Sequence, residues 1–307
     1  MSTQPPPRPG QARYEYHEAP GEYTRNVGGS GSNENEKIAR SYASLAVAHT
    51  ALALPLLFQP REAATFLLGG TALPTNVEQD QLMGLLAAGL LSGATTAWSL
   101  KGAAEEHHLS TAAIRELTRN GFAVGAAAAA LTVAVPASQA LGSKRARRRL
   151  GSHFKRLADG IGRLFDFRGR FRLSSALYAV LTPAFFVAGA SYLLAPQRTL
   201  GNLLGYVTKA SDSIFLWRQA GSLLLTLLPE VTYTLKEKAE DNRLAEQSSR
   251  TLNSGLLLTS IGHLAVLGPM ANEGSSGRYL PVLVGTWAAA FSASVVGLST
   301  SNADRSL

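Results

Sequence analysis

Seven apolar runs of 18 to 23 residues each are the feature of this sequence that most limits its fold. They occupy residues 41–58, 81–100, 121–142, 173–195, 213–235, 251–270 and 279–299. A helix needs about 20 residues to cross the ~30 Å hydrocarbon core of a bilayer. Charged residues make up 16% of the chain, below the roughly 25% typical of soluble domains. The sequence therefore predicts an all-α, polytopic integral membrane protein with about six to seven transmembrane helices, in a membrane that the sequence does not identify.

Aromatic residues near the ends of these runs support the prediction. They are Tyr42, Trp98, Tyr178, Tyr192, Trp217, Tyr233 and Tyr279. Tyrosine and tryptophan gather where a membrane protein meets the lipid headgroups. Two runs are weaker candidates, since 121–142 is rich in alanine and 213–235 contains Arg218 and Glu230. These two runs are interpreted as helices that neighbouring helices shelter from lipid.

The chain divides into five parts by composition. Residues 1–37 are rich in proline, glycine and polar residues, so we expect a disordered tail. The tail contains no apolar stretch of the kind found in a cleavable secretory signal. The predicted order is then a first transmembrane module, a basic amphipathic linker, a second transmembrane module and a C-terminal tail. They cover residues 38–142, 143–172, 173–300 and 301–307.

The two predicted modules share an internal repeat. The stretch "LLFQPREAATFLLGG" at 56–70 resembles "LLAPQRTLGNLLGY" at 193–206, and "WSLKGAAEEHHL" at 98–109 resembles "YTLKEKAEDNRL" at 233–244. Matches in the same order at a nearly constant offset indicate a duplicated unit. Each unit has a spanning helix, a short amphipathic piece that begins at a proline, a second span, a charged loop and a third span. The run 279–299 completes the second unit, whereas the basic stretch fills that place in the first.

This order of elements resembles the small four-helix integral membrane proteins of the DoxX-like group and related uncharacterised families. The likeness is clearest over residues 174–299, beginning with "LSSALYAVLTPAFFVAGASYLLAPQRTLGNLLG", and fainter over 41–142. The resemblance implies a four-helix membrane bundle and no particular activity. The first module departs from the pattern, because its fourth span is missing.

The basic linker has a net charge of +9, compared with +8 for the whole chain. As a helix it would place Leu150, Phe154 and Leu157 on one face, and on the other face Arg148, Arg149, Lys155, Arg156 and Arg163. Such a helix lies in a bilayer interface and contacts anionic headgroups. The candidate headgroup ligands are Lys144, Arg145, Arg147, Arg148, Arg149, Lys155, Arg156 and Arg163. The alternative is a plain basic connector that obeys the positive-inside rule; nucleic-acid binding is disfavoured because both flanks are apolar.

The orientation of the chain poses a conflict at this stage. The basic linker should face the cytoplasm or its equivalent. With three spans before it, the N-terminal tail would face the opposite side, although the tail also carries basic residues. Either the polar tail crosses the membrane, or one of the early runs does not span it. The Ala-rich run 121–142 is the first candidate for a run that does not span.

Three ionisable residues lie inside apolar runs: His49, Glu230 and His263. Such residues are costly in a membrane and are candidates for function. Together they would make a proton relay or a metal site, whereas separately they would form hydrogen bonds between packed helices. The histidines of "EEHH" at 105–108 are interpreted as a solvated face, since "EDNR" stands there in the second repeat.

The sequence contains no phosphate-binding loop, dinucleotide fingerprint, nucleophile elbow or HExxH motif, and it has no cysteine. We therefore expect a non-enzymatic structural or accessory subunit, or scaffold, without a cofactor. Its expected partners are anionic lipids, and other membrane-protein subunits are further candidates. The competing hypothesis is a small transporter or channel with its pathway between the repeats. An intramembrane enzyme that uses His49, Glu230 or His263 is a third reading.

Overall fold

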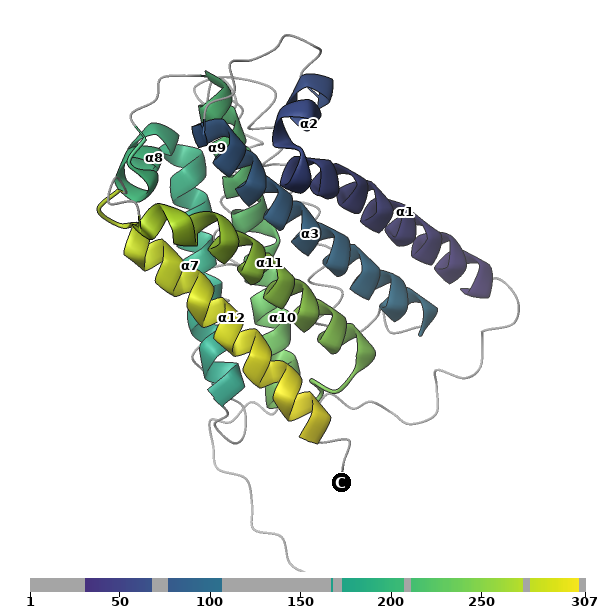
Figure 1. Ribbon diagram of the computed structural model, residues 1–307. Helices are drawn as coiled ribbons and strands as arrows, with labels where there is room; N and C mark the ends of the chain where they lie inside the picture. Colours follow the sequence, from purple (N-terminus) through teal and green to yellow (C-terminus); the bar gives the residue numbers. More distant parts are fainter. Residues whose placement is uncertain are drawn as a thin grey trace, which may run out of the picture.

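The fold is given by a computed structural model (Figure 1), which describes residues 31–67, 77–106, 167, 173–206, 211–272 and 277–303. All elements within these residues are α-helices, and this part of the chain contains no strand. The helices are α1 (Gly31–Phe58), α2 (Pro60–Leu67), α3 (Val77–Glu105), α7 (Leu173–Leu194), α8 (Pro196–Leu204), α9 (Ser211–Thr226), α10 (Leu228–Glu240), α11 (Gln247–Asn272) and α12 (Leu280–Ala303). The predicted all-α class is confirmed.

Five of these helices, α1, α3, α7, α11 and α12, are long and apolar enough to cross a membrane. Each one coincides with an apolar run of the sequence, so the described helices are compatible with a membrane location. The run 121–142 lies outside the described residues. So do residues 1–30 of the predicted tail and all of the basic linker except Phe167.

Several helices extend beyond their apolar runs into charged sequence. α1 begins at Gly31, within the predicted tail, and an ion pair of 2.5 Å joins Glu36 to Arg40 one turn later. α3 continues to Glu105, which pairs with Lys101 at 2.7 Å. Opposite charges four residues apart stabilise a helix modestly. The charged loop predicted after the second span of each unit is therefore helical in its first residues, because α3 continues to Glu105 and α10 to Glu240.

The two short amphipathic pieces that begin at a proline are the helices α2 and α8. Proline suits the first position of a helix, where no hydrogen bond to the backbone N–H is lost. In α8, Leu200 and Leu204 are buried while Arg198 is exposed. The helix ends at Gly205, whose φ of 77° is a left-handed conformation that glycine adopts without strain.

The run 213–235 forms α9 and α10, which only Leu227 separates. Arg218 and Glu230 lie in this stretch, yet the surrounding Trp217, Leu228 and Val231 are almost fully buried. α9 packs against α3 and α7, and α10 packs against α7 and α11. This burial agrees with the expectation that neighbouring helices shelter the run.

One end of the bundle is built around α8, and we call it the α8 end (top of Figure 1). The backbone N–H of Tyr279, which precedes α12, donates to the Asn202 carbonyl at 2.9 Å. The indole Nε1 of Trp217 in α9 donates to Thr199 Oγ1 at 2.8 Å. Tyr206 also donates to Gln81 near the start of α3. Helices α3, α9 and α12 therefore all begin at the α8 end.

The opposite end, which we call the Glu240 end, joins the other helix termini. Ser175 Oγ at the start of α7 donates to Glu240 Oε1 at the end of α10 over 2.9 Å. Ser99 Oγ near the end of α3 donates to the Ser248 carbonyl of α11 over 2.9 Å. α3 and α10 therefore end where α7 and α11 begin.

Candidate functional site

Buried charges at the Glu240 end form the most polar site among the described residues. Lys236 Nζ lies 2.8 Å from Glu240 Oε1, and the two side chains are only 3% and 5% exposed. Glu240 also accepts the hydrogen bond from Ser175. A buried ion pair is tolerated when further hydrogen bonds satisfy the remaining atoms. The pair thus ties α10 to α7 inside the bundle.

A second ion-pair cluster closes the turn between α10 and α11. Lys238 Nζ lies 2.6 Å from Glu246 Oε2, and Arg243 donates to the other oxygen of the same carboxylate. The turn passes through Asn242 at φ 60°, and asparagine tolerates this left-handed conformation. Partial burial raises the pKa of Glu246, but the hydrogen bonds and positive charges of Lys238 and Arg243 outweigh it and lower the pKa overall. The carboxylate is therefore held in its charged form.

Hydrogen bonds between helices continue from this end into the bundle. The hydroxyl of Tyr178 donates to Asn253 Oδ1 at 2.7 Å and lies 3.1 Å from the Ala293 carbonyl, so this side chain of α7 contacts both α11 and α12. One turn deeper, the hydroxyls of Thr182 and Thr232 lie 2.8 Å apart. We call Ser175, Tyr178, Thr182, Thr232, Lys236, Glu240 and Asn253 the polar row. It joins the four helices α7, α10, α11 and α12.

Removing the Tyr178 hydroxyl is expected to destabilise the bundle. Hydrogen bonds between membrane helices contribute about 0.6 kcal/mol on average and at most about 1.7 kcal/mol, so Tyr178→Phe should lower the stability by about this amount. Tyr192→Phe is the matched control, because the buried Tyr192 hydroxyl has no hydrogen-bond partner among the residues that the structure describes. Both variants would be compared by thermal unfolding in detergent. Equal stabilities of the two variants would contradict a structural role of the Tyr178 hydrogen bonds.

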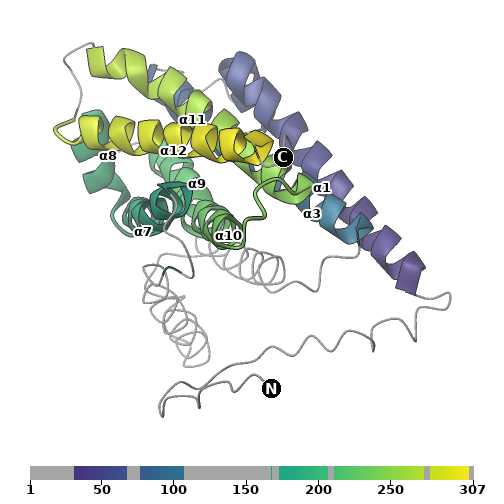
Figure 2. The same ribbon diagram turned by 90° about the horizontal axis from the view of Figure 1, so that it is seen from below.

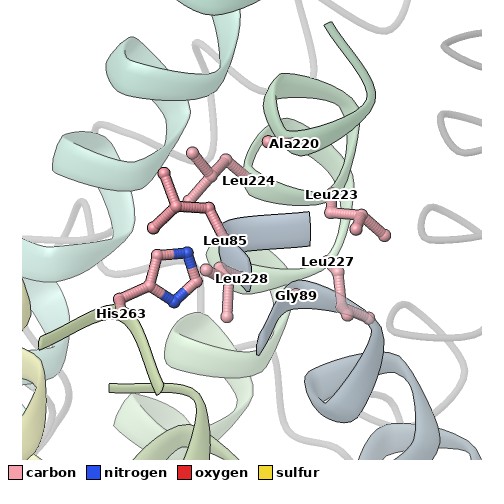
Figure 3. Close-up of a pocket in the computed structure, with 8 residues that line it drawn as sticks. All are labelled: Leu85, Gly89, Ala220, Leu223, Leu224, Leu227, Leu228 and His263. Atoms are coloured by element: carbon pink, nitrogen blue, oxygen red, sulfur yellow. The ribbon is translucent and has the colours of Figure 1, made fainter. Parts of the chain in front are cut away.

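His263 lies deeper in the bundle, and packing accounts for its position. Its Nδ1–H donates to the Thr259 carbonyl of its own helix at 2.9 Å, and its ring stacks on Trp287 with 3.6 Å between centroids. The ring also lines a cavity of about 10 Å³, whose other lining residues are leucines, Ala220 and Gly89 (Figure 3). A cavity of this size holds no more than about one water molecule.

The three ionisable residues of the apolar runs do not gather into one metal site. His49 lies in α1 beside Gly93 of α3, where an added Cβ would be 3.0 Å from His49 Nδ1. Glu230 lies in the first turn of α10. Over the described ranges, no three His, Cys, Asp or Glu side chains are placed to hold a metal ion.

The polar row was not predicted from the sequence. The only sequence signal for it is the spacing of four between Lys236 and Glu240, in a stretch interpreted as a loop. The eight predicted headgroup ligands between Lys144 and Arg163 lie outside the described residues. In comparisons with protein-family models, with curated proteins and with solved structures, nothing matches this chain.

Proposed function

We propose that this chain is a non-enzymatic integral membrane protein, a structural or accessory subunit of two related helical modules with about six to seven crossings. Its basic linker, residues 144–172, would contact anionic lipid headgroups. The observation that carries the proposal is that α3 ends and α7 begins at the same end of the bundle. The stretch of chain between Glu105 and Leu173, which contains the linker, therefore starts and finishes at the same end of the bundle.

Phe167 supports this placement from within the linker sequence. Its ring lies 5.6 Å from Lys236 Nζ of α10, within the range of a cation–π interaction. The linker therefore has one described contact with the Glu240 end, close to where its last residues enter α7. Cations held near an anionic membrane surface contribute about 1 kcal/mol each.

The contacts of the buried polar groups favour a structural role. Tyr178, Thr182 and Glu240 bind partners on neighbouring helices, and His263 binds its own backbone and stacks on Trp287. These are the interactions that hold membrane helices together where the hydrophobic effect between them is weak.

Neutralising the linker should reduce its attraction for anionic lipid. The full chain with Arg147, Arg148 and Arg149 replaced by glutamine is expected to retain several-fold less anionic lipid than the unchanged protein. The measurement is the ratio of phosphatidylglycerol to phosphatidylcholine that copurifies after reconstitution in an equal mixture and extraction with mild detergent.

The control neutralises the same number of arginines near the α8 end: Arg61, Arg198 and Arg278. This variant should retain the anionic lipid of the unchanged protein. An equal loss in both variants would mean that only total charge matters. No loss in the linker variant would refute the proposed lipid contact.

The alternative, a small transporter or channel, is favoured by one observation. The polar row starts at the Glu240 end and reaches Thr182 and Thr232 inside the bundle, near the junction at which Leu227 separates α9 from α10. Interrupted helices near polar groups are common in transporters. Proteoliposomes loaded with a pH-sensitive dye would test this, since flux that Tyr178→Phe abolishes would favour the transporter over the scaffold.

A further inference from the structure

We infer that α9 and α10 together form one kinked membrane crossing, the sixth among the described helices. It follows that the N-terminal end of α1 and the C-terminal end of α12 face the same side of the membrane. The inference rests on the membrane location in the proposed function and adds to it the path and the sidedness of the chain.

The backbone continues through the junction between α9 and α10. Leu227 has φ −95° and ψ −52°, which is a right-handed helical conformation. Its N–H donates to the Leu223 carbonyl at 3.0 Å, and its own carbonyl accepts from Val231 at 3.0 Å. Pro229 has no N–H, so the bond that a helix would make to Leu225 is missing there. A proline that removes one bond kinks a helix without ending it.

The kinked helix is long enough to cross and runs from one end of the bundle to the other. Ser211 to Glu240 would measure about 45 Å as a straight helix, and a bilayer core is about 30 Å thick. At the α8 end, Trp217 bonds to Thr199 of α8. At the Glu240 end, Glu240 bonds to Ser175 of α7. The antiparallel contact between α7 and the kinked helix therefore extends over the full height of the bundle.

The position of this helix explains why its sequence is less apolar than that of the other five. In Figure 2, α9 and α10 lie between α7 and the pair α3 and α11. α9 packs against α3 and α7, and α10 packs against α7 and α11. Arg218 and Glu230 are tolerated because a charged side chain is costly where a helix faces lipid, whereas this helix faces protein.

With six crossings, most of the Lys and Arg residues in the segments outside the crossings fall on one side of the membrane. The segments that leave the bundle at the Glu240 end are 1–30, 106–172, 241–246 and 304–307, and they contain 18 Lys and Arg residues. The segments at the α8 end are 59–76, 195–210 and 273–279, with 4 such residues. The positive-inside rule then places the Glu240 end on the cytoplasmic side or its topological equivalent.

This topology removes the conflict found in the sequence. α1 and α3 form an antiparallel pair joined at the α8 end by α2 and the residues that follow it, so α1 begins at the Glu240 end. An odd number of crossings between Glu105 and Leu173 would put Leu173 at the α8 end, whereas α7 begins at the Glu240 end. The N-terminal tail and the basic linker are therefore both attached to the same face.

The absence of cysteine makes the topology directly measurable, because single cysteines can be introduced without background. Gln197→Cys reports on the α8 end, and Gln247→Cys and Gly102→Cys report on the Glu240 end. Gln197 and Gln247 are exposed, and a Cβ at Gly102 would have no neighbour within 4 Å. Each full-length variant would be treated with a membrane-impermeant maleimide in sealed inside-out vesicles, before and after permeabilisation.

The expected result is labelling of Gly102→Cys and Gln247→Cys in sealed vesicles, and of Gln197→Cys only after permeabilisation. If Gln247→Cys behaves like Gln197→Cys, the kinked helix does not cross and the inference is overturned. The reversed pattern for all three would overturn the assigned side. Equal labelling of all three before permeabilisation would instead refute the membrane location, and with it the proposed function. After permeabilisation every variant should react, which controls for access.

Discussion

Replacement of Gly189 by alanine is expected to destabilise the protein by about 1–3 kcal/mol, the cost of overpacking in a well-packed core. Gly189 of α7 faces α9, and an added Cβ would collide with the backbone nitrogen and the Cα of Leu225. A backbone atom cannot rotate away as a side chain can. The two helices must therefore separate to admit the methyl group. This contact belongs to the kinked helix, so its loss would affect α9 and α10 together.

Gly285→Ala is the matched control for this substitution. Gly285 also lies in a membrane-compatible helix, α12, and a Cβ there would meet nothing within 4 Å. Since alanine has a higher intrinsic helix propensity than glycine, this variant should be as stable as the unchanged protein or slightly more stable. Thermal unfolding in detergent, followed by the loss of the monodisperse gel-filtration peak, compares the two. Equal stability of both variants would contradict the close contact between α7 and α9.

Replacement of Lys236 by methionine is expected to cost about 3–5 kcal/mol, because it leaves the Glu240 carboxylate buried without its charge partner. The side chains of this pair are 3% and 5% exposed, so water cannot compensate for the missing ammonium group. Ser175 still donates to Glu240, but one neutral hydrogen bond does not replace an opposite charge. The expected readout is a large drop in the unfolding temperature in detergent.

The double variant Lys236→Met/Glu240→Met tests the cause of this loss. When both charges are removed, no buried charge is left unpaired, although the Ser175 hydroxyl loses its acceptor, and most of the stability should return. An unchanged loss in the double variant would show that packing of the lysine side chain, and not the pairing of charges, is the source of the effect.

A pair with the same spacing at the same end is the surface control. Lys101 and Glu105 of α3 lie 2.7 Å apart, with side chains 23% and 53% exposed. Exposed pairs contribute at most about 1 kcal/mol, so Lys101→Met should have a much smaller effect than Lys236→Met. A comparable loss in the two variants would contradict the special role of burial.

Much of the helical architecture follows from the sequence. The lengths of the apolar runs predicted α1, α3, α7, α11 and α12, because a helix that contacts lipid must be apolar along its whole length. Proline followed by Leu-Leu-Gly marked the two short amphipathic pieces that form α2 and α8, since proline and glycine act through the local backbone. The extension of α3 to Glu105 was not predicted, because charged residues are as compatible with a helix as with a loop.

Two features were decided only by the tertiary structure. In the sequence, the pair Lys236 and Glu240 looks the same as the pair Lys101 and Glu105. Only the packing of α7 against α10 buries the first pair, whereas the second pair stays more exposed. The path of the chain is the second, since the helix ends that meet at Ser175 and Glu240 are far apart in the sequence. Hydropathy and helix propensity are properties of neighbouring residues, so the sequence by itself determined which segments are helical. Burial, charge pairing and the grouping of helix ends depend on contacts between distant residues, which only the folded bundle specifies.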